Sequence, residues 1–133
     1  MHNLMGLYKR KEIFIAANVY KLNNEKLDIE KSILSINKKI HLLNQAIHDL
    51  KLAFNQKLKN TIISYKLIRA EKMNVLSLTN QKSSLLSSKD ELEEDLLKIQ
   101  QKIIEAKINH KKYIIKIEKL SYAIEYIANL DYS

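Results

Sequence analysis

The sequence predicts an all-α protein, a long two-helix antiparallel coiled-coil hairpin, on the strength of three observations. Apolar residues recur at alternating intervals of three and four along two stretches, which keeps one stripe on one side of each helix. The chain has no proline and a single glycine, Gly6, so nothing breaks either helix from within. A window rich in serine, threonine and asparagine separates the two stretches.

The first stretch begins at Val19, and its heptad frame slips after Phe54. We expect this stripe to lie in the seam, the line along which the two helices face each other, within a first helix covering about residues 3–75. The stripe consists of Val19, Leu22, Lys26, Ile29, Ile33, Ile36, Ile40, Leu43, Ile47, Leu50 and Phe54.

The second stretch predicts a second helix over about residues 89–130, with its own seam stripe. Two seam positions are polar, Lys26 in the first helix and His110 in the second, and polar residues there fix the register at some cost in stability. The second stripe consists of Leu92, Leu96, Ile99, Ile103, Ala106, His110, Tyr113, Ile117, Leu120, Ile124 and Ile127.

We expect one domain over 1–133, with a turn region at about 74–88. A turn centred near residue 75 brings Leu22 level with Ile127 and Phe54 level with Leu96, so matched burial favours a turn near 75–80, and we expect it around 74–82. A capping box formed by Ser88 and a glutamate three residues later favours a later turn. Five carboxylates in 90–95 fit a helix start, or alternatively a solvated face of a helix that begins earlier.

The second helix carries a further apolar stripe, largely on the side away from its seam. It consists of Leu97, Ile104, Ile108, Ile115, Tyr122 and Tyr126, with a weaker counterpart in the first helix at Tyr20, Leu27 and Leu34. A helix that is apolar on two faces is buried on two faces. The stripe predicts either self-association or a surface for another protein.

The net charge of +8 is unevenly distributed. Residues 1–75 hold 14 Lys/Arg and 6 Asp/Glu, whereas residues 76–133 hold 9 of each. This basic first half fits an acidic partner, and it equally fits a solvated lysine-rich helix face.

No catalytic or cofactor-binding pattern is present. The chain has no cysteine, lacks clustered glycines, and places His41 and His48 too far apart along a helix to share one metal ion. We therefore expect no enzyme, no cofactor and no metal. No basic-region pattern predicts nucleic-acid binding, and no apolar run reaches the roughly 20 residues of a transmembrane helix. Residues 4–20 are the one candidate for an interfacial membrane helix.

The chain opens with two leucines followed by three basic residues and a glutamate, and it ends in a tail rich in tyrosine and small residues, 126–133. The opening consists of Leu4, Leu7, Lys9, Arg10, Lys11 and Glu12. The opening, the tail and the hairpin architecture resemble the central stalk proteins of bacterial type III secretion systems, the YscO/EscO/SsaO/FliJ family.

The resemblance implies a cytoplasmic protein, peripheral to the inner-membrane secretion apparatus and monomeric when free. Its terminal end would insert into the hexameric secretion ATPase, stimulate it and link it to the export gate, with secretion chaperones as further partners. The resemblance places contacts with the ATPase in the opening, and the outer stripe of the second helix supplies the other expected partner contacts. Together these residues are Leu4, Leu7, Lys9, Arg10, Lys11, Ile104, Ile108, Ile115, Tyr122 and Tyr126. The alternative is a generic self-associating coiled-coil adaptor or small chaperone.

Overall fold

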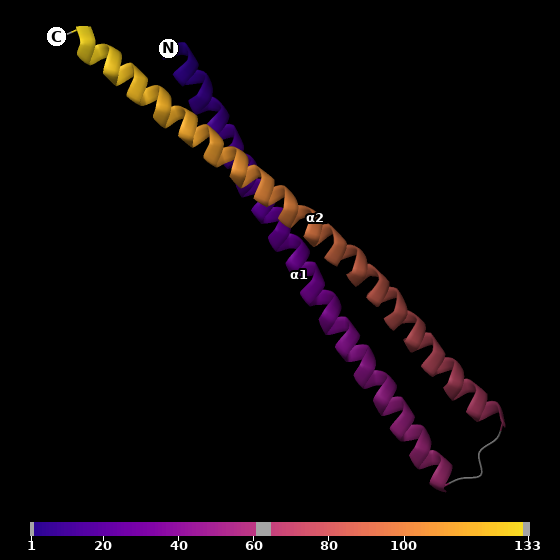
Figure 1. Ribbon diagram of the computed structural model, residues 1–133. Coiled ribbons are helices and arrows are strands. Elements are labelled where there is room, and N and C mark those ends of the chain that lie inside the picture. The colour runs from indigo at the N-terminus through magenta and orange to yellow at the C-terminus, as the bar shows by residue number, and fades with distance from the viewer. Residues whose placement is uncertain (1, 61–64, 132–133) are drawn as a thin grey trace. The chain divides into compact units, whose positions relative to one another are not determined.

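The computed structural model describes residues 2–60 and 65–131, and all of them are helical. Helix α1 spans His2–Asn60 and helix α2 spans Tyr65–Asp131 (Figure 1). The two helices pack against each other without any strand among the described residues. The predicted all-α helical hairpin is therefore confirmed.

The predicted positions of the turn and of the inner helix ends are wrong. Residues 74–88 all belong to α2, which begins at Tyr65 and not near residue 89, and α1 ends at Asn60 and not near residue 75. Serine and threonine can lie within a helix when their hydroxyls donate hydrogen bonds to the backbone carbonyl one turn earlier. Thr79 Oγ1 donates to the Val75 carbonyl at 2.8 Å, and Ser88 Oγ donates to the Ser84 carbonyl at 3.1 Å.

The predicted capping box at Ser88 is consequently also wrong, because this serine lies in the middle of α2. The five carboxylates of 90–95 are all exposed along the same helix. They form a solvated face, which is the alternative that the sequence had left open for them.

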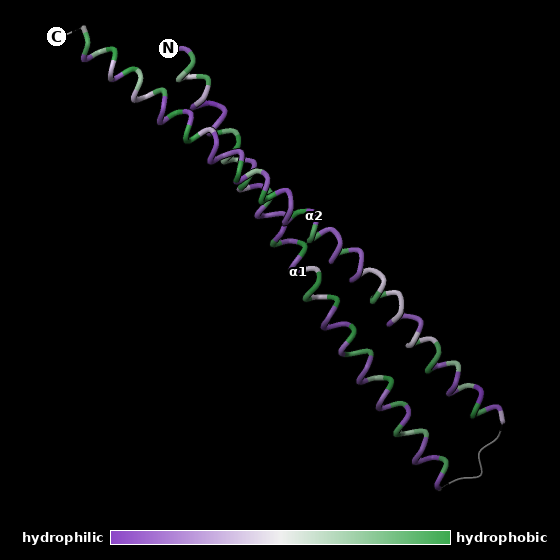
Figure 2. Tube along the Cα trace, viewed as in Figure 1, coloured by the Kyte–Doolittle hydropathy of each residue, from purple (hydrophilic) through white to green (hydrophobic). Residues whose placement is uncertain are grey.

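The seam stripe predicted for α1 is buried or half-buried at every position from Val19 to Phe54. The same spacing of three and four continues toward the N-terminus through four further buried or half-buried residues. They are Met5, Tyr8, Glu12 and Ile15. Figure 2 shows that hydrophobic residues recur at short intervals along both helices.

In α2 the low-exposure stripe begins well before the predicted start at Leu92. Its upstream members are Ile68, Glu71, Val75, Leu78, Lys82, Leu85 and Lys89. At the other end, Ile127 was predicted to be the last seam residue, but its side chain is 43% exposed. The seam of α2 therefore starts earlier and ends at Ile124.

Contacts divide the chain into two compact units, each made of one segment of α1 and one of α2. The first unit comprises Met1–Asp28 and Leu96–Ser133, and the second comprises Ile29–Asp95. Among the described residues, four apolar side chains are at most 9% exposed, and all four belong to the first unit. They are Ile15, Leu22, Ile99 and Ile103.

The register within each unit differs from the predicted one. In the first unit, Leu22 lines a groove with Lys102 and Ala106, so it does not lie level with Ile127. In the second unit, Phe54 lines a cavity with Glu71 and Val75 and does not lie level with Leu96. The predicted end-to-end match of the two heptad runs is wrong because the connection between the helices lies earlier in the chain.

Candidate protein-interaction surfaces

The start of α1 and the end of α2 lie toward the same end of the first unit, because the two segments run antiparallel, with Tyr8 against Tyr113. Leu4 and Leu7 are 42% and 41% exposed there, and Lys9 and Arg10 are exposed as well. No carboxylate among the described residues pairs with Lys9 or Arg10. This end of the unit therefore presents apolar and cationic side chains to solvent.

The last part of α2 adds to this end. Residues 125–130 are all exposed, and three large apolar side chains are among them. They are Tyr126, Ile127 and Leu130. Tyr126 is one of the predicted contact residues, Ile127 was predicted to lie in the seam, and Leu130 carries no prediction. We call the exposed set Leu4, Leu7, Lys9, Arg10, Tyr126, Ile127 and Leu130 the terminal surface.

Lys11 differs from its two basic neighbours because its ammonium lies against an aromatic ring. Its Nζ is 5.7 Å from the ring centroid of Tyr113. Tyr113 meets Tyr8 edge to face, with centroids 6.1 Å apart, and Lys116 Nζ lies 4.9 Å from the Tyr113 centroid and 5.6 Å from that of Tyr8. Such cation–π contacts hold the helices together here, so Lys11 contributes to the fold.

Beside this aromatic cluster, His110 and Glu12 form a part-buried pair across the seam. In the tautomer that carries its proton on Nε2, the His110 ring donates to Glu12 Oε1 over 2.6 Å. His110 was predicted to be a polar seam residue, whereas Glu12 was considered only as part of the basic opening. The alternation of three and four, continued upstream from Val19, would have placed Glu12 in the seam.

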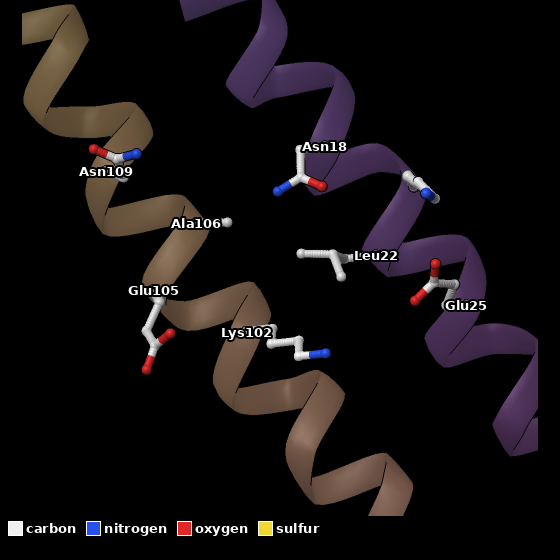
Figure 3. Close-up of a pocket in the computed structure, with 8 residues that line it drawn as sticks. Asn18, Leu22, Glu25, Lys102, Glu105, Ala106 and Asn109 are labelled. Atoms are coloured by element: carbon white, nitrogen blue, oxygen red, sulfur yellow. The ribbon is translucent and has the colours of Figure 1, made fainter.

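Further along the first unit, a polar groove of about 470 Å³ opens between α1 and α2 (Figure 3). Leu22 and Ala106 point toward each other at its floor, and Lys102 extends toward α1. The small side chain of Ala106 leaves the space that a larger seam residue would fill. The rim of the groove is formed by Asn18, Lys21, Glu25, Lys102, Glu105 and Asn109. Because the rim carries two lysines and two glutamates, it has no net charge with which to select a partner.

The second unit contains a smaller and more apolar cavity of about 230 Å³. Its walls are Leu50, Lys51, Phe54, Glu71, Lys72 and Val75. The Glu71 side chain is 15% exposed, and its Oε1 lies 3.9 Å from Nζ of Lys57. Its other oxygen, Oε2, is buried without a hydrogen-bond partner among the described residues.

The stripe that sequence analysis placed on the outer side of α2 is exposed along its whole length. Exposure is 67% at Leu97, 65% at Ile108 and 72% at Tyr122, and the other members, Ile104, Ile115 and Tyr126, are exposed too. Its counterpart on α1, Tyr20, Leu27 and Leu34, is likewise exposed. These side chains do not serve the packing of α1 on α2.

Over residues 2–60 and 65–131, no group of three or more His, Asp or Glu side chains gathers in a way that could hold a metal ion. Within the same residues, neither helix has an apolar segment long enough to cross a membrane. The interaction surfaces described above are therefore the candidate functional features of these residues.

The chain matches no family model, and comparison with curated proteins and with solved structures yields no match either. The features of this chain that bear on function are the hairpin, its exposed surfaces and the resemblance in the opening residues.

Proposed function

We propose that this chain is a non-catalytic helical hairpin that acts by binding other proteins, and specifically the stalk of a type III secretion system. The hairpin inserts the end that carries both termini into a hexameric secretion ATPase, stimulates the ATPase and links it to the export gate. The observation that carries the proposal is the terminal surface, where exposed apolar side chains accompany unpaired cations.

Two features support docking by this end. Apolar side chains with 41–54% exposure at Leu4, Leu7, Ile127 and Leu130 gain free energy when a partner covers them. Lys9 and Arg10 have no carboxylate partner among the described residues, so an acidic surface inside a ring would attract them. The order of leucines and basic residues in the opening is the feature that resembles the secretion stalks.

The test is charge reversal at the terminal surface, with Lys9→Glu and Arg10→Glu combined. Lys11 is left unchanged because its ammonium contacts Tyr113 within the fold. We expect helicity near that of the unchanged protein, together with loss of binding to the purified hexameric ATPase and loss of its stimulation. The matched control is Lys38→Glu with Lys39→Glu, two adjacent exposed lysines of α1 in the second unit.

Two results would contradict the stalk proposal. One is normal stimulation of the ATPase by the Lys9→Glu, Arg10→Glu protein. The other is an equal loss in the Lys38→Glu, Lys39→Glu control, because binding would then depend on overall charge and not on this surface.

A second candidate function, a self-associating adaptor, is favoured by the spacing of the outer stripe of α2. Leu97, Ile104, Ile108 and Ile115 follow at intervals of seven, four and seven, which read the same in both directions. Two antiparallel copies could thus set Leu97 against Ile115 and Ile104 against Ile108, as a two-fold interface requires. Light scattering decides between the candidates, because the stalk is a monomer when free and the adaptor is a stable dimer.

A further inference from the structure

The outer face of α2 in the first unit carries a shallow groove with an apolar floor and a cationic rim. Ile108 and Ile115 form the floor, and Lys111, Lys112, Lys116 and Lys119 surround it. All six residues lie on α2, and one of them, Lys116, also contacts α1 through the ring of Tyr8. We call this set the lysine groove.

Three of the four rim lysines of the lysine groove are exposed cations. No carboxylate among the described residues pairs with Lys111, Lys112 or Lys119, and all three are exposed. Lys116 is the exception, because its ammonium lies over the rings of Tyr8 and Tyr113. Three unpaired cations therefore flank two exposed isoleucines.

We propose that the lysine groove binds an acidic amphipathic helix of a partner protein. An apolar ridge on such a helix would cover Ile108 and Ile115, and carboxylates on both sides of that ridge would meet the lysines. Burial of the apolar floor supplies affinity, and the charges select an acidic helix over a basic one and accelerate its encounter. This surface is distinct from the terminal surface, so the hairpin can engage two partners.

Two other occupants of the groove are distinguished from an acidic helix. A second copy of the chain brings a net charge of +8 and the same lysines, so it neutralises the rim poorly. An anionic membrane would attract the lysines as an acidic helix does, so binding to anionic vesicles is measured as a separate outcome of the test.

The probes are two synthetic helical peptides with the same leucine ridge, one flanked by glutamates and the other by lysines. Binding to the full chain is measured by fluorescence anisotropy at low and at physiological salt. We expect the acidic peptide to bind at least about tenfold more tightly than the basic one, with a preference that shrinks as salt screens the charges.

Variants separate charge recognition from apolar contact. Lys112→Glu with Lys119→Glu should reverse the preference toward the basic peptide, and Ile108→Ser with Ile115→Ser should abolish binding of both peptides. Leu34→Ser, combined with Lys38→Glu and Lys39→Glu, changes exposed residues of the same kinds in the second unit. This control should bind like the unchanged chain, and circular dichroism checks that every variant is folded.

Three results overturn the proposal. They are equal or absent binding of the two peptides, binding to phosphatidylserine vesicles that the same variants abolish, and a dimer that Ile108→Ser with Ile115→Ser dissociates. The outcome is independent of the stalk proposal, because Lys9→Glu with Arg10→Glu should leave peptide binding unchanged. Conversely, Lys112→Glu with Lys119→Glu should leave stimulation of the ATPase unchanged.

Discussion

Glu12 and His110 face each other across the first unit, with carboxylate Oε1 2.6 Å from ring Nε2, although 98 residues separate them along the chain. Both side chains are less than one third exposed. The pair thus replaces an apolar layer of the coiled coil by a polar contact that forms only in this register.

The first prediction concerns the coupling between these two side chains. In a double-mutant cycle with Glu12→Gln and His110→Gln, each single change should lower the free energy of unfolding, and the double change should cost less than the sum. We expect a coupling energy of about 1 kcal/mol, since the hydrogen bond is short and partly shielded from water. Urea unfolding followed by circular dichroism measures it.

The matched control for this cycle is the ion pair of Lys89 and Glu93, whose charged groups are 3.9 Å apart on one face of α2. Its coupling should stay below about 0.5 kcal/mol, because it joins neighbouring turns of one helix at a longer distance and its glutamate is 52% exposed. A coupling between Glu12 and His110 that is no larger than this would mean that their contact does not select the register.

The fold class was predictable from the sequence because the apolar side chains that bury the seam are numerous and regularly spaced. The position of the connection was not, because the seam continues through polar residues. In α1 the upstream part of the seam includes the polar residue Glu12, and in α2 it includes Glu71, Lys82 and Lys89. These polar residues interrupt the apolar pattern by which a seam is recognised in a sequence. Because the predicted stripes began only at Val19 and Leu92, both runs were too short and the predicted turn fell within α2.

For the exposed surfaces, too, one part was predictable from the sequence and another part was not. The apolar stripe of α2 was predictable, because heptad spacing assigns each residue to a side of the helix. The separate role of Lys11 was not, since its contact with Tyr113 depends on which residues of α2 lie opposite. The exposure of Ile127 likewise follows from the register, which leaves the end of α2 beyond its last seam residue.

The second prediction tests the register directly. The chain has no cysteine, so spin labels can be attached at introduced cysteines alone. In two residue pairs, the members lie on opposite helices and border the same cavity: Lys21 with Lys102, and Lys51 with Lys72. Spin labels on the two members of each pair should lie within about 20 Å of each other, because packed helix axes are about 8–10 Å apart. Pulsed electron paramagnetic resonance measures both distances.

A label pair at Lys21 and Glu125 is the control, because position 125 lies about 35 Å further along α2 than position 102. Dilution with unlabelled chain should change none of the distances. A shorter distance for the pair at 21 and 125 than for the pair at 21 and 102 would restore the register predicted from matched heptad runs. Short distances that vanish on dilution would instead show that the coil is intermolecular.

The third prediction concerns the most buried side chains. Leu22→Ala or Ile103→Ala removes methyl groups from the seam of the first unit, where exposure is 9% and 6%. Each change should lower stability by about 2–4 kcal/mol. Lys38→Ala, on an exposed position of α1, should cost under about 0.5 kcal/mol. Equal melting temperatures for these three proteins would refute the seam assignment.

The last prediction is a stabilising change in the second unit. Glu71 buries one carboxylate oxygen without a hydrogen-bond partner among the described residues, beside the apolar side chains of Leu50, Phe54 and Val75. Glu71→Leu should raise stability by about 1–2 kcal/mol, because it removes that unsatisfied oxygen and adds apolar contact in the cavity. The loss of the contact with Lys57 should cost less than about 1 kcal/mol, since the lysine side chain is 56% exposed.

Thermal unfolding of Glu71→Leu is best compared with that of Glu94→Leu, which removes an exposed carboxylate from the same helix. The control should change stability by less than about 0.5 kcal/mol. A lower melting temperature for Glu71→Leu than for the unchanged chain would show that the buried oxygen contributes to stability. The polar group would then be a structural requirement of the second unit, as the Glu12–His110 pair is expected to be in the first.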